Sequence, residues 1–246
     1  MPEQIKKNEY GVLLMNSYIY TGKKTTVITP KDIDGEKLID SATFIINASR
    51  PLKKKKSSGS VSFYKYKGSQ LIDFQLDCIY RICKHPQVIF VAGADTNKMV
   101  KHKRRAEFCV VENKMHELAN NAEDLRIGIN ASIYGQTFWM DGRLVPTIKT
   151  FEQLLQNPKQ SACLVREREG YDLGVVCNSH NVITSFLYRA KLKVSGLYYL
   201  NNVDTNRLKN KVSISFNYNM FDYDLLKEFN MFVVEDKSSS YFLEDS

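Results

Sequence analysis

The sequence predicts an α/β protein with a Rossmann-like, mostly parallel sheet that is flanked by helices and carries an N-terminal β-hairpin arm. Three observations predict this fold. The apolar runs at residues 44–46 and 88–92 are short and continuous, as in buried parallel strands. Between them, residues 68–84 place apolar side chains at helical spacing. The first run also stops abruptly at Asn-Ala-Ser, at the end of a strand where open α/β sheets bind ligands.

Residues 1–41 are predicted to form the N-terminal arm, and residues 42–246 the main α/β domain. Residues 10–20 and 25–29 are rich in Val, Leu, Ile, Tyr and Thr, and Thr-Gly-Lys-Lys between them favours a hairpin turn. A two-stranded ribbon is only marginally stable alone. We therefore expect the arm to pack on the main domain or to pair with another protein subunit.

The rest of the chain alternates predicted helices and strands. Helices are expected at residues 96–104, 121–131, 151–156 and 222–229. Strands are expected at residues 108–111, 137–140, 161–167, 172–177, 181–188, 194–199, 212–217, 231–234 and 241–246. Of these, the strands at residues 161–167, 172–177 and 181–188 are expected to form a meander, with a turn at residues 178–179.

The composition, 43% hydrophobic and 25% charged, is typical of a soluble globular protein. No apolar stretch is long enough to span a membrane, and residues 1–9 are too polar for a secretory signal, so we expect a cytoplasmic protein. Five scattered cysteines predict buried free thiols and no metal site. The four histidines form no ligand pair, and His116 and His180 are predicted in loops without a partner.

A basic loop follows the first predicted strand. Arg50 is followed by Lys53, Lys54 and two further lysines, and then by Ser-Ser-Gly-Ser. These cations favour phosphate binding, although such a charge run is also typical of a solvated surface loop. The net charge of +8 favours anionic partners in general, which include nucleotides, phosphosugars, nucleic acid and acidic protein surfaces.

Several short stretches stand in a recognisable order between residues 42 and 246. They are Phe-Ile-Ile-Asn-Ala-Ser-Arg (44–50), Lys-Tyr-Lys-Gly-Ser-Gln-Leu-Ile (65–72), Val-Ile-Phe-Val-Ala-Gly (88–93), Val-Val-Glu-Asn (110–113), Glu-Asp-Leu-Arg-Ile-Gly-Ile-Asn (123–130) and Met-Asp-Gly (140–142). In their order and spacing the chain resembles the sugar-phosphate nucleotidyltransferases, which have a glycosyltransferase-A-like sheet. The resemblance implies a reaction in which Mg²⁺ helps to join a sugar 1-phosphate to a nucleoside triphosphate.

The chain departs from this family at three positions to which the resemblance assigns chemistry. The glycine-rich triphosphate loop corresponds to residues 47–53, which contain no glycine and include Pro51. The lysine that precedes the segment Gly-x-x-Leu-Ile corresponds to Val61. The carboxylate that would hold Mg²⁺ corresponds to Arg143, whose guanidinium does not bind cations.

Other acids near these positions are expected to replace the lost carboxylate poorly. We expect Asp141 to point away from the metal position, so that its recruitment needs a change of register. The second metal carboxylate of the family falls near Glu244 or Asp245. One carboxylate alone holds Mg²⁺ weakly. We therefore predict no metal and no cofactor.

These departures favour a catalytically inactive protein of this fold, which serves as a structural or binding subunit of a larger assembly. Its partners would be other protein subunits, which it would bind through the N-terminal hairpin. A virus particle is one such assembly, because many phages carry genes of this family. The localisation would then be the virion.

Two alternatives stay open. An active enzyme that makes a nucleotide-activated sugar would place Arg50 and Lys67 on the triphosphate, Asp141 and Asp245 on Mg²⁺, and Asn130 near the base or sugar.

A site that keeps a ligand without metal or reaction would instead line a cationic cleft with Arg50, the lysines at residues 53–56 and Arg143. Arginine suits this role because its guanidinium forms two parallel hydrogen bonds with a phosphate or a carboxylate. The ligand would be a nucleotide or an acidic peptide.

Overall fold

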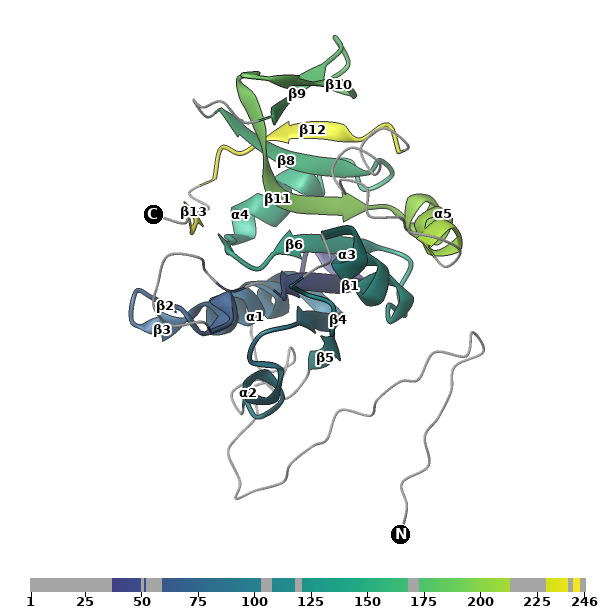
Figure 1. Cartoon of the computed structure of the whole chain (residues 1–246). Helices are drawn as coiled ribbons and strands as arrows, with labels where there is room; N and C mark the ends of the chain where they lie inside the picture. Colours follow the sequence, from purple (N-terminus) through teal and green to yellow (C-terminus); the bar gives the residue numbers. More distant parts are fainter. Residues whose placement is uncertain are drawn as a thin grey trace.

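Helices cover both faces of a central sheet in this protein (Figure 1). The structure is a computed structural model that describes residues 37–49, 51, 59–102, 108–117, 121–167, 173–212, 229–238 and 241–243. Within these residues, nine strands form the sheet. Seven follow one another in the order β10 (Ile183–Tyr188), β9 (Leu173–Cys177), β11 (Leu192–Leu200), β6 (Thr137–Asp141), β1 (Ile39–Ala48), β4 (Cys83–Ala92) and β5 (Phe108–Glu112). The other two are β8 (Ala162–Glu167), beside β11, and β12 (Phe232–Glu235), beside β8.

The sheet has a parallel half and a largely antiparallel half. In the parallel half, β1 pairs with β4 and β6, and β4 pairs with β5. In the other half, β11 runs antiparallel to β6, β8 and β9, while β10 forms an antiparallel hairpin with β9. The predicted Rossmann-like α/β fold is confirmed. The meander is confirmed for β9 and β10 only, because β8 pairs with β11 and β12.

Alternating side chains of β1 point into two separate apolar cores. Phe44 lies in a core with Ile72 of α1 and Phe151 of α4, and its ring stacks on that of Phe138 with centroids 4.8 Å apart. Ile45 lies on the opposite face, in a core to which α3 and α5 contribute. The helices that pack on these two cores are α1 (Leu71–Ile82), α3 (Asn121–Asn130), α4 (Ile148–Leu154) and α5 (Asn202–Val212).

Short elements surround the carboxyl ends of the parallel strands. The 3-10 turn η2 follows the basic loop, a two-residue hairpin precedes α1, and a short antiparallel pair follows β6. These elements are η2 (Val61–Phe63), β2 (Lys65–Tyr66), β3 (Ser69–Gln70), α2 (Thr96–Val100), β7 (Leu144–Val145) and β13 (Tyr241–Phe242).

Several predicted elements differ from the structure in their bounds. β1 begins at Ile39, so the first strand of the main sheet starts inside the predicted arm. The strand predicted at residues 212–217 is wrong at its start, since Val212 ends helix α5. Residues 1–36 and 213–228 lie outside the described residues, and with them the predicted hairpin and most of the helix predicted at 222–229.

The five cysteines are free thiols, as predicted, but only three of them are buried, and Cys109 and Cys177 are partly exposed. Burial raises the pKa of the Cys78 and Cys83 thiols to about 12, so both stay protonated at neutral pH. In the part of the chain that the structure describes, the helices are all too short or too polar to cross a membrane.

Candidate functional site

Four neighbouring parallel strands end side by side at one edge of the sheet, in the order β6, β1, β4 and β5. Asn47 of β1 is level with Asp141 of β6 and with Val91 of β4. From β1 the chain crosses through α1 to β4 on one side, and it returns through α3 to β6 on the other side. The ends of β1 and β6 therefore form the switch point at which open α/β sheets bind ligands. We call this the carboxyl edge.

A buried polar network centred on Asp124 lies at the carboxyl edge. This carboxylate, in the first turn of α3, accepts hydrogen bonds from Ser49 Oγ (2.8 Å) and Asn113 Nδ2 (2.7 Å). Asn47 contacts the Ser49 hydroxyl at 2.9 Å and donates through Nδ2 to Asn121 Oδ1 at 3.1 Å. Because a buried carboxylate is tolerated only when it is hydrogen-bonded, this network fixes the end of β1 against the start of α3.

The turn after β6 carries an ion pair between Asp141 and Arg143. Arg143 donates through Nε to Asp141 Oδ1 (3.0 Å) and through Nη2 to Oδ2 (2.8 Å), and its backbone N–H also donates to Oδ1 (2.9 Å). The two side chains are 20% and 37% exposed, so the pair borders solvent. The expectation that Asp141 points away is wrong. The chain leaves the strand at Gly142 and turns, and this turn, in which the Arg143 N–H donates to Asp141 Oδ1, brings the two side chains together.

These residues do not fit the Mg²⁺ ion that the resemblance implies. Mg²⁺ binds oxygen ligands, but both carboxylate oxygens of Asp141 already accept hydrogen bonds from a guanidinium. Among the described residues, no group of three or more His, Cys, Asp or Glu side chains is placed to hold a metal ion. The predicted second carboxylate, Asp245, lies outside the described residues.

Val61, at the position of the family's lysine, is buried beside the same turn. Its side chain packs in an apolar cluster with Leu71 and Leu243. A Cβ added to Gly142 would lie 3.1 Å from Val61 Cγ1, so the valine lies against the turn that carries the ion pair. This position therefore supplies an apolar contact where a lysine would supply charge.

The main chain around Gly142 is held from two sides. Its N–H donates to the carbonyl of Asn47 at 2.8 Å, and a Cβ at this position would lie only 2.2 Å from that oxygen. From the other side, the buried Gln75 donates through Nε2 to the carbonyls of Gly142 and Leu144, both at 3.0 Å. The turn is therefore fixed at its backbone, and only the side chains of the ion pair border solvent.

The basic loop begins and ends at the carboxyl edge. Pro51 and Ser60 form an isolated β-bridge, and Ser60 donates through its backbone N–H to Asp95 Oδ2 (2.9 Å) and through Oγ to the Ala48 carbonyl (3.1 Å). The loop itself lies outside the described residues, and with it the predicted ligand-binding residues Arg50, Lys53 and Lys54.

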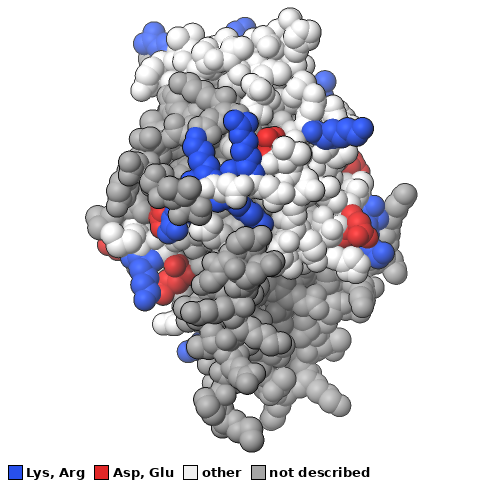
Figure 2. All heavy atoms as spheres, turned by 90° about the vertical axis from the view of Figure 1, so that its right-hand side faces the viewer, with Lys and Arg blue, Asp and Glu red and all other residues white. Residues whose placement is uncertain are grey.

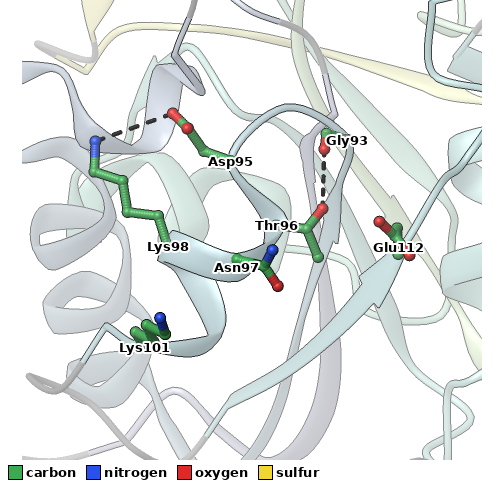
Figure 3. Close-up of a pocket in the computed structure, with 7 residues that line it drawn as sticks. All are labelled: Gly93, Asp95, Thr96, Asn97, Lys98, Lys101 and Glu112. Atoms are coloured by element: carbon green, nitrogen blue, oxygen red, sulfur yellow. Dashed lines mark hydrogen bonds and ion pairs between the residues drawn. The ribbon is translucent and has the colours of Figure 1, made fainter.

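A polar cleft of about 550 Å³ opens beside the ends of β4 and β5 (Figure 3). Lys98 Nζ lies 4.0 Å from Asp95 Oδ2, and Thr96 Oγ1 donates to the Gly93 carbonyl at 2.9 Å. Two lysines and two acids balance the formal charge of the lining, so this cleft gives an anion little net attraction. The lining residues are Gly93, Asp95, Thr96, Asn97, Lys98, Lys101 and Glu112.

His116 also lies at the carboxyl edge, although the sequence placed it in a loop without a partner. A Cβ added to Gly93 would lie 2.3 Å from His116 Cγ and 2.4 Å from the Ser49 carbonyl oxygen, so only glycine allows this approach. Nδ1 of the histidine is 3.1 Å from the Asn113 carbonyl oxygen. The contact joins the ends of three strands, and no local sequence signal indicates it.

Two further predicted site residues lie elsewhere. Asn130 is the last residue of α3, a ten-residue helix that starts at the carboxyl edge. Because α3 is about 15 Å long, Asn130 lies toward the opposite edge, so the structure does not bring it to the carboxyl edge. Lys67 is exposed in the tight turn between β2 and β3, with φ of 46°, and its ammonium lies 5.3 Å from the centre of the Tyr66 ring.

Part of the positive charge is far from the carboxyl edge. Figure 2 shows Lys and Arg side chains gathered on the side of the molecule where α5 lies. This helix contains Arg207, Lys209 and Lys211. Lys209 donates to the Ser132 carbonyl at 3.0 Å, and burial lowers the pKa of its ammonium. The net charge therefore does not identify the carboxyl edge as the only surface for an anionic partner.

No protein-family model matches the sequence, and no curated protein matches it either. Solved structures do match. The CTP:phosphocholine cytidylyltransferase from Streptococcus pneumoniae has a TM-score of 0.66 at 16% identity, over 83% of this chain and 94% of that one. The inositol-1-phosphate CTP transferase from T. maritima has a TM-score of 0.64 at 17% identity, over 85% and 91% of the two chains. A CMP:2-keto-3-deoxy-manno-octonic acid synthetase complexed with CTP has a TM-score of 0.59 at 13% identity, over 80% of this chain and 90% of that one. The protein therefore has the nucleotidyltransferase fold that the resemblance implied.

Proposed function

We propose that this protein is a nucleotidyltransferase-fold subunit that has lost Mg²⁺-dependent transfer and serves a binding or structural role. The observation that carries the proposal is the ion pair at the end of β6. Both oxygens of Asp141 accept hydrogen bonds from Arg143, at 3.0 and 2.8 Å, so the carboxylate nearest the switch point is already neutralised. A divalent cation there would meet a permanent positive charge.

The surroundings of the pair support the same proposal. Val61 replaces the cation that would neutralise a triphosphate, and its burial in an apolar cluster leaves no space for a charged group there. Asp124 is also unsuited to a metal, because Ser49 and Asn113 already donate to it in a buried network. The acids that the structure describes near the switch point are thus committed to protein contacts.

The partners that we propose are other protein subunits, with the N-terminal hairpin as one attachment, and a virus particle is one assembly that would use such a subunit. An anionic ligand without a metal is compatible with this role. Arg143 would exchange its two hydrogen bonds with Asp141 for two with a phosphate or carboxylate. Thermal shift with nucleotides, with and without Mg²⁺, tests the ligand, and stabilisation that is independent of Mg²⁺ supports it.

Release of pyrophosphate tests the loss of catalysis. The panel starts with CTP, phosphocholine and inositol 1-phosphate, which the names of the similar structures supply, and extends to other nucleoside triphosphates and sugar phosphates. We expect no turnover above that of a matched Asp141→Ala variant at any Mg²⁺ concentration. Mg²⁺-dependent turnover that disappears in Asp141→Ala would contradict the proposal.

One observation favours the alternative of an active enzyme. Asp141 already lies beside Arg143 at the switch point, so a change in the Arg143 side chain alone would release its carboxylate from the guanidinium. No register change is needed. If the protein is an active enzyme, turnover in the same assay should increase in Arg143→Ala, because the competing cation is gone. An inactive subunit would show no turnover either as wild type or as Arg143→Ala.

A further inference from the structure

The turn that carries the ion pair is bound through three successive main-chain carbonyl groups. Gln75 of α1 donates through Nε2 to the carbonyls of Gly142 and Leu144, both at 3.0 Å. The carbonyl between them, that of Arg143, accepts from the Leu243 N–H at 3.0 Å. The main chain on both sides of the Arg143 side chain is therefore fixed, and a single side chain, that of Gln75, makes two of the three bonds.

Glutamine suits this position because of its neutral NH₂ group. Gln75 is fully buried, and one nitrogen binds two carbonyl oxygens only if it carries at least two N–H bonds. A glutamate would place a carboxylate against the two carbonyl oxygens, and a methionine of similar length offers no donor. A lysine has enough donors but would bury an unpaired charge. Among side chains of this length, the neutral amide supplies both bonds without a buried charge.

The other end of the same amide has no hydrogen bond. Among the described residues, no donor meets the buried Gln75 Oε1. A buried acceptor without a partner costs stability, which offsets part of what the two hydrogen bonds contribute. Stability alone therefore explains this side chain poorly, and its distinguishing contacts are the bonds to the turn.

We propose that Gln75 is the positioning residue of the Asp141–Arg143 pair, because it sets the direction in which the Arg143 side chain leaves the main chain. The guanidinium contacts the two oxygens of Asp141 at 3.0 and 2.8 Å, so a small rotation of the turn would break both contacts. The pair matters through the proposed function, on which this inference rests. Gln75 acts on the pair only through the turn.

Gln153 provides a matched control for Gln75. It is also a buried glutamine on a helix, and it donates through Nε2 to a main-chain carbonyl, that of Glu235, at 3.1 Å. Its Oε1 likewise lacks a hydrogen bond within the described part of the chain. The bond holds the end of β12, which is separated from β6 by β8 and β11. The same substitution at the two positions therefore removes the same group and releases different segments.

NMR of the arginine Nε–H groups in the full chain tests the inference without a ligand. The Arg143 signal is identified by its absence in Arg143→Lys, and exchange of its hydrogen with water reports the bond to Asp141 Oδ1. In Gln75→Met we expect this exchange to become at least about tenfold faster, since a hydrogen bond to a charged group contributes roughly that factor or more. In Gln153→Met the exchange should keep the wild-type rate.

Two outcomes would overturn the inference. One is a folded Gln75→Met variant with wild-type exchange at Arg143, and the other is an equal change in Gln153→Met. If Gln75→Met does not fold, Gln75→Asn takes its place, because its amide is one methylene too short to bind both carbonyls and should also speed the exchange. The signal needs neither ligand nor turnover. Pyrophosphate release by the wild type would therefore contradict the loss of catalysis and leave the positioning role of Gln75 standing.

Discussion

Two aspartates at the carboxyl edge differ in what surrounds them. Asp124 is buried and accepts hydrogen bonds from Ser49 and Asn113, which are themselves buried. Asp141 lies beside solvent and is neutralised by Arg143, a side chain that is itself 37% exposed. The first carboxylate is held by groups that cannot leave without unfolding the edge. The second is held by one flexible side chain and by one backbone N–H of the same turn.

The difference separates the architecture of the site from its chemistry. The Asp124 network positions the end of β1 and the start of α3, whatever ligand the protein binds. The Asp141–Arg143 pair determines whether the end of β6 presents a carboxylate or a neutral pair to a ligand. Loss of the first should therefore affect stability, whereas loss of the second should mainly affect binding.

The largest expected effect is that of Asp124→Ala. The substitution leaves the buried Asn113 amide without its Asp124 acceptor and leaves the Ser49 hydroxyl with Asn47 Oδ1 alone. We expect it to lower the free energy of unfolding by about 3 kcal/mol, measured by denaturant titration. The control is Asp77→Ala, which removes an exposed i,i+4 pair with Arg81 and should cost less than about 0.5 kcal/mol. Equal effects of the two substitutions would show that the network is not the stronger element.

A smaller effect is expected for Gly142→Ala. The added methyl group would lie 2.2 Å from the Asn47 carbonyl oxygen, so the turn that carries the ion pair must move away from β1. We expect a loss of about 2 kcal/mol in the free energy of unfolding.

The control for this prediction is Gly68→Ala. No atom lies within 4 Å of its added methyl group, but its φ of +87° strains any other residue, at a cost of about 1 kcal/mol. A Gly142→Ala variant no less stable than Gly68→Ala would mean that the contact with β1 relaxes freely.

The strands of the parallel half could be predicted because their apolar runs are continuous and end at polar residues. Helix α5 could not. Only Thr205 and Leu208 are buried among its described side chains, so no apolar stripe marks it in the sequence. At the site, the resemblance identified Arg143 as the residue in the metal position. The network around Asp124 was not predicted, because its partner Ser49 is 75 residues away in sequence and only the folded sheet joins them.

The ion pair itself should contribute little to stability. A double-mutant cycle with Asp141→Ala and Arg143→Ala measures the coupling between the two side chains without the effects of each alone. We expect about 0.5 kcal/mol, because the pair borders solvent and is screened by salt. A coupling above about 2 kcal/mol would show that the pair belongs to the architecture in the same way as the Asp124 network.

The smallest expected effect is the response to Mg²⁺, and it decides most directly what Arg143 does. In the wild-type protein the guanidinium occupies both oxygens of Asp141, so addition of about 10 mM Mg²⁺ should leave the melting temperature unchanged. In Arg143→Ala the guanidinium is gone and only the backbone N–H of residue 143 still donates to the carboxylate. We expect a stabilisation below about 1 kcal/mol, because one carboxylate binds Mg²⁺ weakly. In the double variant Asp141→Ala/Arg143→Ala, addition of Mg²⁺ should again leave the melting temperature unchanged. If wild type and Arg143→Ala respond equally, the cation binds elsewhere and Arg143 does not control access to Asp141.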